Sequence, residues 1–184
     1  HHMARVYREA HGMHVSCGIL FNHESPLRGE EFVTRKITMG MARMAYDPDA
    51  GPIHLGNLHA RRDWGHAAEY VGGMHAMLGM AMPDDYVLAT GATTSVGSFA
   101  VMAARAAGFE PEWRDGEYEE HATIVDRGTS RLLVAVAPQF YRPNEVNMLC
   151  GDAAKAHAVL GWKPEMKIEA LVADMVAADL KRLA

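Results

Sequence analysis

Apolar residues along the chain follow two patterns, which together predict alternating strands and helices. Two uninterrupted runs, MHVSCGILF at 13–21 and YVLAT at 86–90, are typical of strands buried on both faces. Shorter apolar runs predict strands at 53–58, 109–114 and 132–138. Apolar residues at three-to-four spacing predict helices over 4–11, 31–46, 65–82, 95–107, 152–160 and 168–183. This alternation indicates the α/β class.

Local signals refine these elements. The helix over 65–82 is predicted because Ala67, Val71, Met74, Leu78 and Ala81 would lie on one of its faces. Ser95 is placed to cap the helix that follows it, and glycines stand where three helices should end: Gly12, Gly108 and Gly161. The acidic segment 115–131 predicts an irregular, flexible loop.

The start of the chain predicts that it is part of a longer protein. The helix over 4–11 has no capping residue ahead of it, as though its first turns lay upstream. His1 and His2 resemble the end of a purification tag, so residues 1–3 are set aside. Residues 4–184 are treated as one unit.

Charge and cysteine content exclude several classes of partner. The net charge is −5 and no basic stripe is available to neutralise phosphates, so we expect no nucleic-acid partner. The apolar runs are too short to span a membrane and no secretory signal opens the chain, so we expect a cytoplasmic protein with no membrane partner. Cys17 and Cys150 are predicted to be buried thiols.

Two further patterns have simple interpretations. Histidine pairs such as His11 and His14 lack the spacing and carboxylates of a metal site, so no metal is expected. The loop 91–97 follows a strand and precedes a helix, but it matches neither phosphate-binding glycine motif. We interpret it as an ordinary strand-to-helix connection.

Several polar residues lie where α/β proteins build ligand sites. Asn22 and His23 follow the carboxyl end of a strand, and Arg35 and Lys36 lie in the first turns of the next helix. Cations oppose the dipole there, so a bound anion would offset the conflict. The segments RRDW (61–64) and RPNE (142–145) add arginines beside carboxylates, groups that suit phosphate and ribose. Any one arginine could equally be solvated, but together these elements predict a nucleotide or sugar-phosphate binder.

The same segments resemble a known family. ILFNHESPLRGEEFVTRKIT (19–38) is similar to a stretch of the GDP-mannose 4,6-dehydratases, members of the extended short-chain dehydrogenase/reductase family. The likeness continues through RRDWGHAAEYV (61–71), ATGATTSV (89–96), FYRPNEV (140–146), GDAAKAH (151–157) and LGWKPE (160–165). It covers nearly all of residues 4–184. FNHESP followed by VTRKI is the most specific part.

The resemblance implies a fold and a reaction. The fold would be the last strands of a Rossmann-type sheet plus the small substrate-binding domain, with the N-terminal NADP-binding part absent. The reaction would convert GDP-mannose to GDP-4-keto-6-deoxymannose and water, using NADP. By position, the residues that resemble those holding the GDP-sugar are Asn22, Lys36, Arg62, Arg142 and Glu145, while His23 and Arg28 resemble residues that reach NADP.

The catalytic motifs of that family are not in these 184 residues. The glycine-rich fingerprint, the Thr and Glu acid/base pair and the Tyr-x-x-x-Lys motif belong to the part upstream. Tyr7 does not replace that tyrosine, because His11 stands where a lysine is needed. We therefore expect no catalytic residue here, GDP-sugar binding without turnover, and a homo-oligomer or a missing N-terminal chain as partner. Two alternatives stay open, a related GDP-sugar reductase or epimerase and a non-catalytic binding or assembly subunit.

Overall fold

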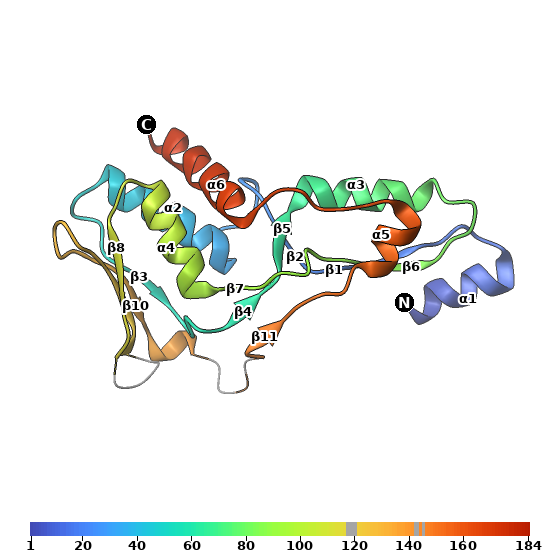
Figure 1. Ribbon diagram of the computed structural model, residues 1–184, viewed down its shortest axis with the longest axis horizontal. Coiled ribbons are helices and arrows are strands. Elements are labelled where there is room, and N and C mark those ends of the chain that lie inside the picture. Colours follow the sequence, from blue (N-terminus) through green and yellow to red (C-terminus); the bar gives the residue numbers. More distant parts are fainter. Residues whose placement is uncertain (117–120, 142–143, 145) are drawn as a thin grey trace.

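The computed structural model describes residues 1–116, 121–141, 144 and 146–184 and confirms the α/β class (Figure 1). The helices are α1 (His2–His11), α2 (Val33–Tyr46), α3 (Ala67–Leu78), α4 (Val96–Ala106), α5 (Ala154–Leu160) and α6 (Ile168–Leu183), with the short 3-10 turn η2 (Pro138–Phe140). The strands are β1 (Cys17–Leu20), β2 (Asn22–Glu24), β3 (Ile53–Leu55), β4 (Arg61–Arg62), β5 (Trp64–His66), β6 (Asp85–Leu88), β7 (Thr94–Ser95), β8 (Pro111–Arg114), β9 (Thr123–Asp126), β10 (Leu132–Val136) and β11 (Met148–Leu149).

Two hydrophobic clusters lie at the two ends of the elongated molecule (Figure 1). At one end α3 and α5 pack on the parallel pair β1–β6. At the other, α2, α4 and α6 cover a sheet of order β3-β10-β9-β8, in which β3 and β10 are parallel and the other pairs antiparallel. A buried ion pair of 2.7 Å joins Arg35 on α2 to Asp179 on α6.

Short strands connect the two ends. β2 pairs with β5, and β4 lies between β11 and β7. At their centre is the buried carboxylate of Asp63, which accepts hydrogen bonds from the Thr90 amide (2.9 Å), the Thr90 hydroxyl (2.6 Å), the Gly91 amide (2.9 Å) and the Gly151 amide (3.2 Å). One side chain thus joins three segments that are far apart in the sequence.

The helix boundaries follow the predicted signals closely. Gly12, Gly108 and Gly161 all have positive φ (61°, 93° and 65°), the left-handed conformation that ends helices. The Ser95 hydroxyl accepts a hydrogen bond from the Ser98 amide (3.0 Å), which caps α4 as expected. The segment 91–97 also includes the short strand β7, which was not predicted. Helix α1 includes His2, which the sequence analysis had set aside.

The packing predicted for one strand is wrong, and the packing of one helix was not predicted. Strand β1 is not buried on both faces, because Ile19 is 51% exposed, and β6 is its one strand neighbour in the described part of the chain. In α3 the exposed residues include Val71, Met74 and Leu78, whereas Tyr70, Gly73 and Met77 are buried. Apolar residues surround most of this helix, so spacing alone could not choose its buried face. The buried face of α3 is the one that carries Tyr70, because the Tyr70 ring packs against the rings of His23 and Trp162.

Two other expectations also need correction. The segment 115–131 is not wholly irregular, because β9 lies within it and pairs with both β8 and β10. The β-branched residues Thr123, Ile124 and Val125 favour this strand. The cysteines are not both buried, since Cys150 is exposed and Cys17 partly so. No helix in the described ranges is long and apolar enough to cross a bilayer.

The Asp63 contacts generate a stability prediction. Asp63→Asn should lower the free energy of unfolding by about 2–4 kcal/mol, because an amide cannot accept from all four donors and leaves buried N–H groups unsatisfied. Urea unfolding would measure the loss. The matched control is Asp49→Asn in the exposed 47–50 turn, which should change little. Equal effects of the two substitutions would contradict the central role of Asp63.

Candidate functional site

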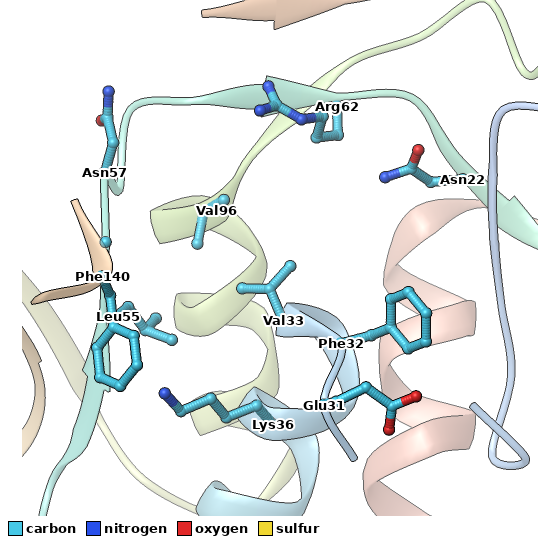
Figure 2. Close-up of a pocket in the computed structure, with 11 residues that line it drawn as sticks. Asn22, Glu31, Phe32, Val33, Lys36, Leu55, Asn57, Arg62, Val96 and Phe140 are labelled. Atoms are coloured by element: carbon cyan, nitrogen blue, oxygen red, sulfur yellow. The ribbon is translucent and has the colours of Figure 1, made fainter. Parts of the chain in front are cut away.

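A cavity of about 490 Å³ opens where β2, α2, β3, β4, α4 and η2 meet (Figure 2). Its walls combine polar and apolar side chains, and the described lining is Asn22, Glu31, Phe32, Val33, Lys36, Leu55, Gly56, Asn57, Arg62, Val96 and Phe140. Two cations, one carboxylate (Glu31), two amides and several apolar side chains therefore face one space.

Three of the five residues predicted to hold a substrate meet at this cavity. Asn22, Lys36 and Arg62 all line it, although 40 residues separate the first from the last (Figure 2). Arg142 and Glu145 lie outside the described residues. Phe140 lines the cavity, and the Val146 carbonyl accepts a hydrogen bond from Arg62.

Arg62 and its neighbour Arg61 diverge, as expected for adjacent residues of a strand. Arg61 donates to the backbone carbonyl (2.7 Å) and hydroxyl (3.1 Å) of Thr93. Arg62 donates through Nη1 to the carbonyls of Arg61 (2.8 Å) and Val146 (2.7 Å) while lining the cavity. Carbonyl anchors of this kind help to orient a guanidinium.

Lys36 lies one turn into α2 and points toward the ring of Phe140, with 3.8 Å between its Nζ and the ring centroid. No carboxylate of the described residues pairs with this ammonium. Burial without a counter-ion lowers the pKa of Lys36 below its usual range. A bound anion would relieve that unfavourable desolvation.

The first turn of α2 borders the same space. Phe32 is the N-cap residue, and no side chain caps the helix. Both Phe32 and Val33 line the cavity. The N-terminus of a 14-residue helix favours an anion. Arg35 does not add to this charge, contrary to expectation, because it is buried against Asp179.

The two residues predicted to reach a cofactor lie beside the cavity and do not line it. His23 stacks on Tyr70 with 5.4 Å between ring centroids, and its Nδ1 lies 2.8 Å from the Phe21 carbonyl. The Arg28 guanidinium lies 3.4 Å from the ring centroid of Phe32 and forms an ion pair of 3.3 Å with Glu24. His23 lies on β2, and Arg28 lies in the loop that leads from β2 into α2.

The sequence analysis missed part of the lining. Asn57 carried a usable signal, since it follows the end of a strand as Asn22 does. No sequence signal marked Phe140 as a lining residue, because it reaches the cavity only through the packing of η2 against β3. That contact is a hydrogen bond from the Ala137 amide to the Leu55 carbonyl (2.8 Å).

The arrangement suits a phosphorylated ligand that also has uncharged polar groups. Arg62, Lys36 and the α2 N-terminus supply positive charge, while Asn22 and Asn57 supply amides for hydroxyl or carbonyl groups. Leu55, Val33, Val96 and Phe140 provide apolar surface. The sequence matches the family model described as GDP-mannose 4,6 dehydratase over residues 1–175. This chain belongs to that family.

Similar proteins agree with this assignment. The GDP-mannose 4,6-dehydratase of Sinorhizobium fredii is 52% identical over 177 residues, which cover 96% of this chain and 50% of that protein. This chain therefore spans about half the length of that relative. Such relatives are named as dehydratases, which favours this branch over a reductase or epimerase.

Solved structures confirm the fold expected for the C-terminal part of an extended short-chain dehydrogenase. RMD from Pseudomonas aeruginosa, complexed with NADPH, matches 98% of this chain and 53% of its own, with a TM-score of 0.77 at 18% identity. UDP-glucose 4-epimerase from Thermotoga maritima, with UDP-glucose, matches all of this chain and 51% of its own, with a TM-score of 0.76 at 18% identity. At such low identity these likenesses show the fold alone.

A buried carboxylate beneath the site yields a pH prediction. Burial raises the pKa of Glu24 although Thr34 donates a hydrogen bond of 2.6 Å to it. In the unfolded chain this group loses its proton near pH 4.5, whereas in the folded chain it retains the proton to higher pH. The folded state therefore binds more protons in that window, and the contribution of Glu24 to stability falls as pH rises from about 4.5 through the raised pKa.

Glu24→Gln removes this titration and keeps a hydrogen-bond acceptor for Thr34. The difference in unfolding free energy, wild type minus Glu24→Gln, should fall steadily as pH rises through the window. Urea unfolding of both proteins at about four or five pH values, starting near pH 4, would measure this difference. A difference that stays constant, or that grows with pH, would be inconsistent with a raised pKa.

Proposed function

We propose that this chain is the substrate-binding part of a GDP-mannose 4,6-dehydratase, a lyase that converts GDP-mannose to GDP-4-keto-6-deoxymannose and water. The observation that supports it best is that Asn22, Lys36 and Arg62 meet at one cavity beside an uncapped helix N-terminus. The family assignment supplies the reaction, and the cavity supplies a place for the nucleotide sugar.

Each residue has a physical role in this proposal. Arg62 presents a planar guanidinium for two parallel hydrogen bonds to the diphosphate, and Lys36 adds a mobile point charge. Asn22 donates to and accepts from sugar hydroxyls. Arg142 and Glu145, which lie outside the described residues, are proposed to hold the second phosphate and the ribose hydroxyls, by their place in the RPNEV segment.

The cofactor proposed for the reaction is NADP, which when bound supplies reversible hydride acceptance. Two features of this chain fit it. With Nδ1 of His23 engaged by the Phe21 carbonyl, its Nε2 is available to a ligand. The buried Nε of Arg28 lacks a hydrogen-bond partner in the described structure, despite the ion pair with Glu24. In this tautomer Nδ1–H donates to the Phe21 carbonyl, so Nε2 of His23 would accept a hydrogen bond from a ribose hydroxyl or the carboxamide N–H of the dinucleotide. Arg28 would donate to phosphate or ribose oxygens at the edge of the sugar site.

The motif needed for proton transfer at the sugar is not found in these 184 residues. None of the six tyrosines is followed four residues later by a lysine, and no glycine pattern matches the dinucleotide fingerprint. No residue at the cavity combines a phenol with a nearby ammonium that would lower its pKa and let it take a hydroxyl proton. The role proposed for these 184 residues is therefore to bind and orient the substrate.

A second candidate function is that of a binding or assembly subunit. The specific observation in its favour is exposed apolar surface: Ile19 on β1, and Val71, Met74 and Leu78 on α3, are 46–68% exposed. Surface of this kind drives association between chains. Assembly with a companion chain, or with a second copy, would cover it.

The binding role predicts a preference for the nucleotide. Calorimetry should show GDP and GDP-mannose binding more tightly than mannose, because most of the charge complementarity is to phosphate. Arg62→Lys should weaken GDP binding by about 1–3 kcal/mol, since a lysine cannot make two parallel bonds. Arg61→Lys is the matched control and should change it little, because Arg61 faces Thr93. Mannose binding as tight as GDP, or equal effects of the two substitutions, would overturn the proposal.

The absence of the proton-transfer motif predicts the behaviour of the 184-residue chain alone. With GDP-mannose and NADP added it should give no keto product, and light scattering should report a dimer or a larger species. A product assay and multi-angle scattering would check both expectations. Turnover by this chain alone would refute the binding-only role, and a stable monomer would refute association.

A further inference from the structure

Phe140 occupies an unusual position for a large apolar residue. It is 44% exposed and yet held firmly at the cavity wall, in the η2 turn that docks on the end of β3. The contact with β3 is so close that a side chain at Gly56 would lie 2.2 Å from the Phe140 carbonyl oxygen. The backbone thus fixes an aromatic ring where it faces ligand space instead of the core.

The cavity has two distinct sides (Figure 2). Phe140, Leu55 and Asn57 lie on one side, and Asn22 and Phe32 on the other, with Arg62 between them. A nucleoside diphosphate sugar has one planar apolar group, the base, at one end and a polar sugar at the other. With the diphosphate at Arg62, the aromatic wall is matched to the base and the Asn22 side to the sugar.

We propose that Phe140 is a specificity-determining residue whose ring stacks on a purine and so selects purine over pyrimidine nucleotides. This inference rests on the proposed function. A purine offers two fused rings for stacking, so an aromatic platform binds it more strongly than a single pyrimidine ring. Base–aromatic stacking is also tolerant of ring substituents, so ADP and GDP should both benefit from it.

The Asn57 amide is compatible with a purine beside this ring. Its Oδ1 accepts from the His59 amide (2.8 Å), which leaves the side-chain N–H groups as donors. Guanine presents the O6 and N7 acceptors to such a donor, and adenine presents N7. A hydrogen bond here would add to stacking for both purines, so the test must separate the two contributions.

Lys36 connects the base side to the phosphates. Without a ligand its ammonium lies over the Phe140 ring, 3.8 Å from the centroid. A diphosphate attracts the ammonium more strongly than a ring does, because a full negative charge replaces a quadrupole. When the ammonium turns to the phosphate, that face of the ring becomes free for a base.

The overall fold does not determine the choice of base. The epimerase from Thermotoga maritima, solved with UDP-glucose, shares this fold with a TM-score of 0.76. A pyrimidine nucleotide thus occupies a protein of the same architecture. Selection in this chain must then come from local residues, and Phe140 is the aromatic side chain on the Leu55–Asn57 side of the described cavity lining.

The test measures Kd for GDP, ADP and UDP by calorimetry on the wild-type chain, Phe140→Leu and Phe140→Tyr. The matched control is Tyr46→Leu, an equally aromatic but exposed position at the far end of α2. Wild type should bind both purine nucleotides about tenfold tighter than UDP, a preference worth about 1.4 kcal/mol. Phe140→Leu should reduce this ratio to about twofold while leaving UDP nearly unchanged, and Phe140→Tyr should retain it.

Each other outcome is decisive. An unchanged purine preference in Phe140→Leu overturns the inference, as does a wild type that binds GDP and UDP alike. Equal loss of all three nucleotides in Phe140→Leu also overturns it, since the ring would then hold the shape of the cavity and not the base. Failure of the wild type to bind any nucleotide overturns the proposed function itself, and the inference with it.

Discussion

The carboxylate of Asp63 is the point on which the geometry of the site depends. It receives hydrogen bonds from the segments at 90–91 and 151, so it fixes the loop that precedes α4 and the stretch that follows β11. These segments lie next in sequence to β7 and β11, the two strands that flank β4, and β4 carries Arg62. A buried acceptor with several backbone donors is costly to disrupt, so the direction of Arg62 is set by the interior and not by its own flexible side chain.

A second constraint is the grouping of positive charge at the cavity. Lys36 has a lowered pKa, Arg62 lines the same space, and α2 begins without a side-chain cap. The lowered pKa of Lys36 and the uncapped helix start both favour a bound anion. Two buried contacts hold α2 in place. Thr34 on α2 donates a hydrogen bond to Glu24 on β2, and Arg35 on α2 forms an ion pair with Asp179 on α6. The helix can thus present its N-terminus without shifting.

The sequence predicted the class of fold and much of the site, for reasons that can be stated residue by residue. Gly12, Gly108 and Gly161 marked helix ends because positive φ is a local property. The segments that carry Asn22 and Lys36 could be chosen because strand ends and helix starts are where α/β proteins place ligand groups. The choice of Lys36 over Arg35, and of Arg62 over Arg61, came from the family resemblance. The buried face of α3 could not be predicted, since it depends on which partner Tyr70 meets across the fold. The positions of Arg35 and Phe140 could not be predicted for the same reason. Arg35 is drawn away from the cavity by Asp179 on α6, and Phe140 is brought to it by the contact of η2 with β3, and both partners are distant in sequence.

The central claim is that the cavity beside α2 binds the diphosphate of a nucleotide sugar through Arg62 and Lys36. The most direct measurement is a crystal structure of the 184-residue chain grown with GDP. The account predicts the diphosphate within hydrogen-bond distance of the Arg62 guanidinium and the Lys36 ammonium, at the N-terminus of α2. GDP bound elsewhere on the chain, or a diphosphate in this cavity that contacts neither cation, would contradict it.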